Sequence, residues 1–158
     1  KLLEAQEKMI RRGGLATLRM KSTDEGKAYL TPGIIDVTEM DATDEEFFGP
    51  LLQVIREIDF DRAIDMANST RYGLSAGLLS DRRDLFDQFY ARVKAGVIHW
   101  NRPTTGASSM LPFGGIGDSG NHRPAGYWSA EYCSYPVAVL ESDKLKIPDT
   151  IPPGLGSA

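Results

Sequence analysis

The spacing of apolar residues in the first fifty positions predicts one helix and two extended segments. Residues 2–12 place apolar side chains near one helical face and end at Gly13-Gly14, a common helix stop. Apolar stretches at residues 15–20 and 29–37 favour short strands. An acidic turn at residues 41–46 follows them.

The middle of the chain has the most regular pattern. In order, it predicts a strand at residues 51–58, a helix capped by Asp59, a strand at residues 74–79, a helix capped by Ser80 and a strand at residues 97–100. Strands that alternate with helices through short connections usually pair in parallel. We therefore expect an α/β fold, in which these strands form one parallel sheet with flanking helices.

Residues 100–124 have neither a helical nor a strand period, yet they are too apolar for a disordered segment. Their glycines permit close backbone approach, and their prolines stiffen the chain. Because they follow the carboxyl end of a strand, they lie where α/β sheets usually bind ligands. A binding loop and a purely structural Ω-loop both fit this pattern.

The end of the chain contains three weaker signals. Residues 126–132 fit a short helix, and residues 135–140 fit a final strand. Residues 143–158 are rich in proline and glycine and are expected to be a surface tail, so that residues 1–142 form the folded unit. The chain begins at Lys1 inside a helical pattern, and we expect the parent protein to continue upstream.

Composition excludes several classes of function. The formal charge of −4 gives no basic surface for nucleic acid, and no apolar run approaches the length of a membrane span. Cys133 is the only cysteine, so no intrachain disulfide can form, which fits a cytoplasmic protein. Two histidines are too few for a metal site unless carboxylates complete it.

A series of short motifs resembles the aldehyde dehydrogenase superfamily. The motifs are EEFFGP at residues 45–50, ANST at 67–70, YGL at 72–74, Asn101, PFGG at 112–115 and SG at 119–120. Their order and spacing match the family over nearly the whole chain. The resemblance implies the carboxyl-terminal part of the catalytic domain of an NAD-dependent oxidoreductase. It also implies a homo-oligomer, with residues 135–140 joining a neighbouring subunit's sheet rather than capping their own.

Within the family, the last third of the chain is similar to the members that act in bacterial arginine catabolism. The similar stretches are GNHRP at residues 120–124, AEYC at 130–133 and PVAVLES at 136–142. Those members oxidise N-succinylglutamate 5-semialdehyde with NAD. The resemblance therefore implies a small aldehyde substrate that also carries two carboxylates.

The resemblance places no catalytic residue in this chain. The family's nucleophilic cysteine, its general-base glutamate and its dinucleotide-binding domain match positions upstream of Lys1. Cys133 matches the position after the last short helix, where a structural thiol is expected. We therefore expect the chain alone to be inactive, with the remainder of the parent polypeptide as its partner. The alternative is a stand-alone assembly or binding module of the same fold.

Two residues match the family's nicotinamide site. Glu46 matches the glutamate that binds the ribose hydroxyls, a role that suits a pure hydrogen-bond acceptor. Phe48 matches the aromatic residue beside the nicotinamide. From the residues alone, without the resemblance, a solvated acidic turn is the favoured interpretation of Glu46, because Asp41, Asp44 and Glu45 are near it in the sequence.

The resemblance also places the substrate side at the loop, at Asn101, Gly106, Ala107, Ser108 and Phe113. Because the implied substrate carries carboxylates, we expect Arg102 to belong to this side as well. Arg102 and Arg123 are candidate cations for a substrate carboxylate, because arginine binds carboxylates through two hydrogen bonds. Arg123 fits a structural ion pair equally well, and Asn101 could anchor the loop rather than contact substrate. His122 is expected to have a structural role.

Overall fold

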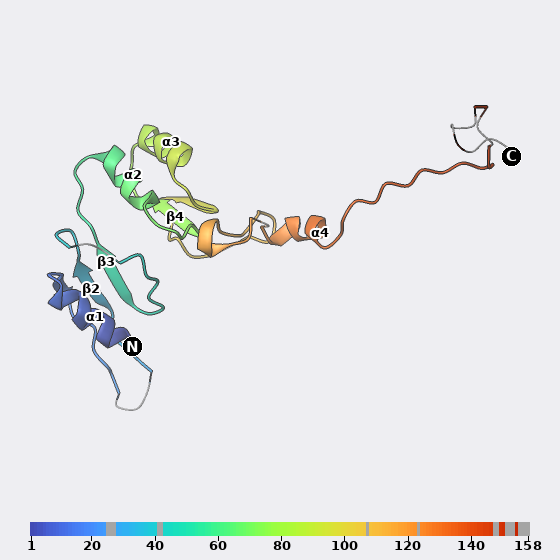
Figure 1. Ribbon diagram of the computed structural model, residues 1–158. Coiled ribbons are helices and arrows are strands. Elements are labelled where there is room, and N and C mark those ends of the chain that lie inside the picture. Colours follow the sequence, from blue (N-terminus) through green and yellow to red (C-terminus); the bar gives the residue numbers. More distant parts are fainter. Residues whose placement is uncertain are drawn as a thin grey trace.

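The computed structural model describes residues 1–24, 28–40, 43–106, 108–122, 124–146, 149–150 and 154. Its elements in chain order are α1 (Leu2–Arg11), β1 (Leu15–Leu18), β2 (Gly33–Asp36), β3 (Leu51–Val54), α2 (Phe60–Asn68), β4 (Ser75–Leu78), α3 (Arg83–Arg92), β5 (Val97–Trp100), the 3₁₀ turns η1 (Gly117–Ser119) and η2 (Gly126–Trp128), and α4 (Ser129–Tyr132). They form two adjoining parts followed by an extended end (Figure 1).

The first part is α1 packed against a three-stranded sheet. β1 and β2 are antiparallel, whereas β2 and β3 are parallel with Gly33 opposite Leu51. Met9 of α1, Ile35 of β2 and Val37 are buried together and form the core. Burying a side chain of this size contributes roughly 1.5–3 kcal/mol, so this contact holds α1 on the sheet.

Gln6 makes a second, polar connection between α1 and the sheet. Its side chain is buried, and its amide donates to the carbonyl of Met20 at 3.1 Å and accepts from the N–H of Met20 at 2.6 Å. Because an unpaired buried polar group costs about 1–3 kcal/mol, this reciprocal pair also fixes where the chain leaves β1.

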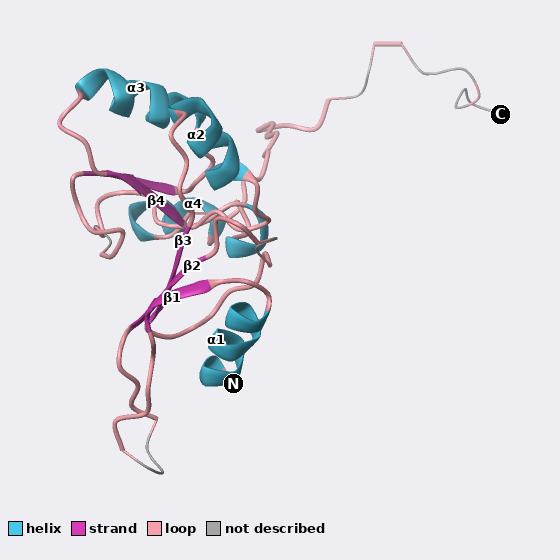
Figure 2. Ribbon diagram, turned by 90° about the vertical axis from the view of Figure 1, so that its left-hand side faces the viewer, coloured by secondary structure: helices cyan, strands magenta, loops and turns pink. Residues whose placement is uncertain are grey.

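The second part contains α2, α3 and a two-stranded parallel sheet. β4 and β5 pair with Ser75 opposite Val97 and Leu78 opposite Trp100. The Trp100 ring stacks on Phe86 of α3, with the ring centroids 4.9 Å apart. Figure 2 shows α2 and α3 on the same side of β4, so the helices cover one face of this sheet.

Polar contacts join the two helices. The side chain of Asn68, at the end of α2, donates to the carbonyl of Arg92 at 3.0 Å and accepts from the N–H of Lys94 at 2.8 Å. The guanidinium of Arg92 pairs with Asp61 and Asp65 of α2. The end of α3 is therefore held against the end of α2, just before β5 begins.

Several sequence predictions are confirmed at the level of single elements. α1 ends at a positive φ of 106° at Gly13, which a glycine adopts without strain. The carboxylate of Asp59 accepts the N–H of Arg62 at 2.9 Å and caps α2. β5 has the predicted bounds, and residues 126–132 form η2 and α4.

The prediction of one parallel sheet is wrong. Among the described residues β3 pairs with β2, whereas β4 pairs only with β5. The predicted strand at residues 51–58 stops at Val54 because the chain turns there: the N–H of Arg56 donates to the hydroxyl of Thr38 at 2.9 Å, and Ile58 is fully exposed. The helix that follows therefore leads into a new sheet.

The predicted cap at Ser80 is also wrong. α3 begins at Arg83, and no side chain caps it. The hydroxyl of Ser80 instead accepts the N–H of Arg82 at 3.1 Å, and its carbonyl accepts the indole N–H of Trp100 at 2.9 Å. Ser80 thus stabilises the turn between β4 and α3.

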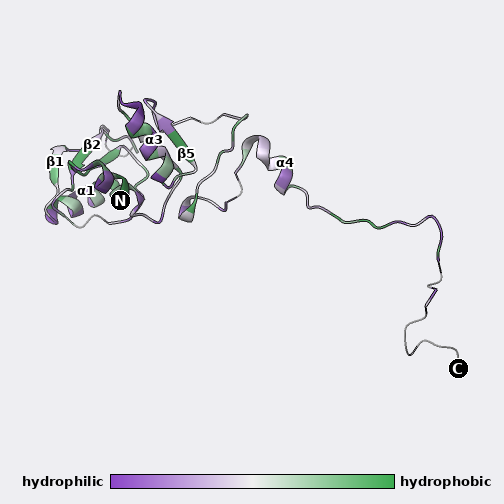
Figure 3. Cartoon of the chain, turned by 90° about the horizontal axis from the view of Figure 1, so that it is seen from above, coloured by the Kyte–Doolittle hydropathy of each residue, from purple (hydrophilic) through white to green (hydrophobic). Residues whose placement is uncertain are grey.

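Residues 135–140 form no strand and do not cap the chain's own sheet. They run away from the rest of the fold, and Val137 and Leu140 are 68% and 94% exposed. Figure 3 shows apolar residues along this extended stretch beyond α4. Pairing with a neighbouring subunit stays a prediction. In the part of the chain described here, no helix combines the length and apolarity needed to cross a membrane.

Asp36 provides a test of the first sheet. Its pKa is lowered from 3.8 to about 2, first by the hydroxyl of Thr38 and then by the guanidinium of Arg56. A carboxyl with a depressed folded-state pKa contributes stability that is complete above its unfolded pKa and is lost as pH falls toward the folded one. We expect Asp36→Asn to lower the urea midpoint at neutral pH and to flatten its fall below about pH 5.

The matched control is Asp81→Asn, at an exposed aspartate that forms no ion pair within the described residues. It should leave the pH profile as in the wild type. If Asp36→Asn keeps the full acid loss of the wild type, the Asp36 contacts do not contribute to acid stability.

Candidate functional site

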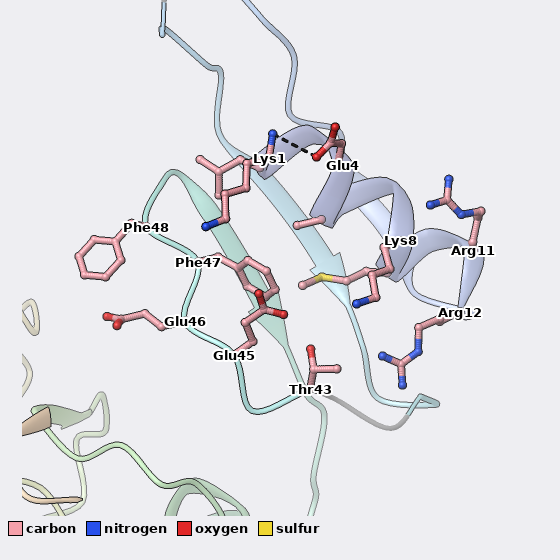
Figure 4. Close-up of a pocket in the computed structure, with 13 residues that line it drawn as sticks. Lys1, Glu4, Lys8, Arg11, Arg12, Thr43, Glu45, Glu46, Phe47 and Phe48 are labelled. Atoms are coloured by element: carbon pink, nitrogen blue, oxygen red, sulfur yellow. Dashed lines mark ion pairs between the residues drawn. The ribbon is translucent and has the colours of Figure 1, made fainter. Parts of the chain in front are cut away.

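The extended segment 45–48 separates its side chains onto two sides. Phe47 lies between the segment and α1 and packs against the core, whereas Glu46 and Phe48 point away from α1 (Figure 4). Phe48 is 83% exposed. This period of two is that of an extended chain. It leaves one carboxylate and one aromatic ring side by side on the open side, whereas the half-buried ring of Phe47 holds the segment on the core.

Asp44 ties this segment to the second part of the fold. One of its carboxylate oxygens accepts the hydroxyl of Thr70 at 2.5 Å, and the other accepts the N–H of Arg71 at 2.8 Å. These contacts lower the pKa of Asp44, the hydroxyl of Thr70 most of all. The guanidinium of Arg71 lies 3.3 Å from Asp118 in η1, so three stretches of chain meet here.

A cavity of about 480 Å³ lies between this segment and the residues that lead into β4. Its lining includes Glu46, Tyr72 and Ser119. A second cavity of about 410 Å³ separates the segment from α1 and is bordered by Lys8 and Arg11 (Figure 4). Glu46 borders both cavities, so its carboxylate is reachable from outside the fold.

Asn101 begins the long loop after β5 in a left-handed conformation, with φ at 52°. Its side-chain carbonyl accepts the N–H of Ser80 at 2.9 Å, and its amide donates to the carbonyl of Ser80 at 3.0 Å. Its own N–H donates to the carbonyl of Leu78 at 2.9 Å. Both ends of the amide are occupied, which favours the anchoring role over substrate contact.

The far end of the loop is fixed at the start of β4. The carbonyl of Gly73 accepts the N–H groups of Gly96 and Ile116, and the N–H of Gly73 donates to the hydroxyl of Ser119 at 3.1 Å. Gly96 lies so close to the loop that an added Cβ would stand 1.7 Å from the carbonyl oxygen of Gly114. Only glycine permits this approach.

Between these two ends the loop and β5 enclose a cavity of about 510 Å³. The predicted substrate residues that line it are Arg102, Gly106, Ser108 and Phe113. His99 and Thr105 line it as well. The loop therefore brings a cation, hydroxyl groups and an aromatic ring to one hollow beside the end of β5.

Charge distinguishes Arg102 within this cavity. Its guanidinium is exposed and, within the residues the structure describes, forms neither an ion pair nor a hydrogen bond. The Ser108 hydroxyl accepts the N–H of Met110 at 3.2 Å and keeps its own proton available to a ligand. Gly106 adopts a φ of 95°, which turns the chain between Arg102 and Ser108.

The other predicted residues fall elsewhere. Asn101 does not line the cavity, and Glu46 and Phe48 lie at the separate segment before β3. Ala107 and Arg123 lie outside the described residues, so their predicted roles stay predictions.

The thiol and the second histidine are also placed. Cys133 is exposed at the end of α4, away from both cavities beside β4 and β5. His122 has a φ of 61° and borders a different hollow beside α4. The described residues contain no cluster of three metal-ligating side chains.

Two residues of the candidate site, His99 and Asp44, were not predicted from the sequence. His99 has a buried Nε2 with no hydrogen-bond partner among the described residues, and it borders the loop cavity. Strand alternation could have found it, because Trp100 packs on α3 and its neighbour must face the other side. In the sequence, Asp44 is one of several acidic residues of a turn. No local pattern predicts its hydrogen bond to Thr70, which is 26 residues away.

Known proteins resemble this chain over most of its length. The model of the aldehyde dehydrogenase family matches residues 1–139. The N-succinylglutamate 5-semialdehyde dehydrogenase of Chromobacterium violaceum is 57% identical over 154 residues, which are 98% of this chain and 32% of that protein. The enzyme of that name from Hahella chejuensis is 53% identical over 155 residues, with the same coverage. The chain thus spans about a third of the length of these curated relatives.

Solved structures match as well. A Thermus 1-pyrroline-5-carboxylate dehydrogenase with bound NAD superposes with a TM-score of 0.74 and 31% identity, over 80% of this chain and 25% of that one. A Pseudomonas putida salicylaldehyde dehydrogenase complexed with salicylaldehyde gives 0.67 and 26%, over 79% of this chain and 26% of that one.

Asn101 yields a test of the loop anchor. Asn101→Ala removes both bonds to Ser80 and places a residue without a local hydrogen bond in the left-handed region. We expect it to lower the free energy of unfolding of this chain by about 2 kcal/mol in urea titrations. Asn101→Gly loses the same bonds but keeps the backbone freedom, and it should lose about half as much. Equal stability of Asn101→Ala and the wild type would contradict the anchoring role.

Proposed function

Because the chain belongs to the aldehyde dehydrogenase family, we propose that it forms the carboxyl-terminal part of the catalytic domain of an NAD-dependent enzyme. The reaction we propose is oxidation of N-succinylglutamate 5-semialdehyde to N-succinylglutamate. The observation that supports this substrate most directly is the high identity to curated relatives of that name along nearly the whole chain.

On the cofactor side, Glu46 and Phe48 fit the nicotinamide end of NAD. A carboxylate that is exposed and borders a cavity can accept both hydroxyls of a ribose. The neighbouring exposed ring of Phe48 offers a flat apolar face to a nicotinamide. NAD supplies the hydride acceptor when it is bound. The task of this chain there is to fix the position of the nicotinamide ribose.

On the substrate side, the loop cavity fits an aldehyde that carries carboxylates. Arg102 offers a guanidinium without a protein partner among the described residues, and Ser108 offers a hydroxyl proton. Phe113 supplies an apolar wall of the same cavity. An uncharged aldehyde has no use for the arginine, whereas a carboxylate can accept two hydrogen bonds from it.

The reaction also needs a thiolate to attack the aldehyde and a base to activate the water that hydrolyses the resulting thioester. From the family resemblance, we infer that both groups lie in the part of the parent polypeptide that precedes Lys1. The exposed Cys133 borders neither the loop cavity nor the cavity next to Glu46. This chain therefore binds and orients both reactants, and the rest of the parent polypeptide supplies the nucleophile and the base.

The extended end supports the proposal of a homo-oligomer. Residues 135–140 lie exposed, are apolar throughout and make no strand within their own chain. A strand with free N–H and C=O groups can complete the edge of a sheet in a second subunit.

The substrate proposal is tested by Arg102→Met in the parent enzyme, because methionine keeps much of the stem and removes the charge. We expect kcat/KM for N-succinylglutamate 5-semialdehyde to fall by about 30-fold or more, which corresponds to losing a charged hydrogen bond of about 2 kcal/mol. An uncharged aliphatic aldehyde should lose far less. Arg62→Met, on the exposed surface of α2, is the matched control. Equal losses for the two aldehydes would assign Arg102 a structural role.

A second test addresses the division of labour. The purified 158-residue chain should form no NADH from the semialdehyde, because it lacks the nucleophile and the base. Co-purified full-length enzyme is excluded by mass spectrometry. Steady NADH formation by the chain alone would show that its own residues complete the site.

A further inference from the structure

We propose that Asp44 is a positioning residue that sets where Glu46 and Phe48 stand relative to the substrate loop. The proposal rests on the nicotinamide role given to these two residues above. Asp44 acts through the contacts to Thr70 and Arg71 that we term the Asp44 clasp.

Segment 45–48 needs such an anchor because its own backbone provides little support. Within the described residues, the backbone N–H groups of residues 46–48 donate no hydrogen bond, and that of Glu45 bonds only to Thr43, at 2.8 Å. The two exposed side chains are not held by packing. The direction in which they point therefore depends on the residues at each end of the segment.

Two apolar contacts hold the segment to the first part of the fold. Phe47 packs into the core beside α1, and Gly49 lies so close to Leu2 that an added Cβ would stand 2.2 Å from its Cδ1. Neither contact reaches the second part. In the described residues around this segment, the Asp44 clasp is the hydrogen-bonded connection to the turn that precedes β4, through Thr70 and Arg71.

The partners of Asp44 in the clasp lie next to the residues that fix the carboxyl-terminal end of the substrate loop. Thr70 and Arg71 are directly followed by Tyr72 and by Gly73, whose carbonyl accepts the N–H of Ile116 at 3.0 Å. The carbonyl of Arg71 also accepts the N–H of Asp118 at 2.8 Å. Asp44 therefore connects the cofactor segment to the turn that closes the substrate loop. A shift there moves the carboxylate of Glu46 and the ring of Phe48 away from the nicotinamide ribose and so weakens the binding of NAD, while the substrate loop keeps its own contacts.

The test uses the full-length parent enzyme with Asp44→Ala, Asp44→Asn and Thr70→Val. Hydrogen exchange of peptides that cover residues 43–49 reports on the clasp, and KM for NAD and KM for the aldehyde report on position. We expect Asp44→Ala and Thr70→Val to speed exchange there and to raise KM for NAD by about tenfold, the scale of weakening one charged hydrogen bond to the ribose. KM for the aldehyde should change less than twofold. Asp44→Asn keeps one acceptor and should give intermediate values.

Asp118→Asn is the matched control, because it removes a charge that also faces Arg71 but leaves both hydrogen bonds of Asp44 in place. It should behave as the wild type in both measurements. If Asp44→Ala does not fold, Thr70→Val and Asp44→Asn carry the test.

Two outcomes overturn the inference. Unchanged exchange in every Asp44 and Thr70 variant shows that the clasp does not hold the segment. Faster exchange with an unchanged KM for NAD shows that the segment's position does not matter for the cofactor. Glu46→Gln then separates the two proposals: if it raises KM for NAD, only the role of Asp44 fails, and if it does not, the nicotinamide site at Glu46 fails as well.

Discussion

The second part of the fold depends on the two ends of β4, because both ends of the long loop are hydrogen-bonded there. The loop begins where the N–H of Asn101 meets the carbonyl of Leu78, and it closes where the N–H of Ile116 meets the carbonyl of Gly73. Between them the carbonyl of Thr104 accepts the hydroxyl of Ser75 at 3.2 Å. The loop is thus laid back along the strand pair it follows, on the face that α3 does not cover.

This arrangement explains why a long irregular loop can be ordered. A connection of this length has too little regular hydrogen bonding to hold its own shape. Here its ends are fixed by backbone bonds, and its return is fixed by the close approach of Gly96 to Gly114. Side chains such as Arg102 can then stay exposed without losing a defined position, which a binding site requires.

The local sequence pattern predicted where most helices and strands lie, but it did not predict which strands pair with each other. The type of most elements depends on neighbours in sequence, and the cap at Asp59 has a local cause. Strand pairing depends on contacts that no local pattern encodes. The run that was predicted to reach Ile58 ends at Val54, because Arg56 is bound to Thr38 and Asp36 from another segment. The prediction of a single parallel sheet was wrong because contacts of this kind, from other segments, decide which strands pair.

For the candidate site as well, the sequence predicted the residues that take part but not all of their contacts. The resemblance selected Gly106, Ser108 and Phe113, and charge selected Arg102; the structure gathers all four around one cavity. The sequence alone could not distinguish Asn101 from these substrate residues. Only the fold shows that the side-chain amide of Asn101 is hydrogen-bonded to the backbone of Ser80.

Charge pairing gives the strongest physical reason to regard the loop cavity as an anion site. Several other arginines of this chain stand beside carboxylates: Arg56 is next to Asp36, Arg83 is next to Asp87, and the half-buried Arg92 is next to Asp61. Arg102 has no such neighbour in the described residues, although the chain carries 22 acidic residues and a formal charge of −4. An unpaired guanidinium beside a cavity keeps its full capacity for two hydrogen bonds to a carboxylate. The chain as a whole is acidic, so its long-range attraction for an anion is weak. Selection of a carboxylate at this cavity therefore depends on the local geometry of Arg102 rather than on the charge of the whole surface.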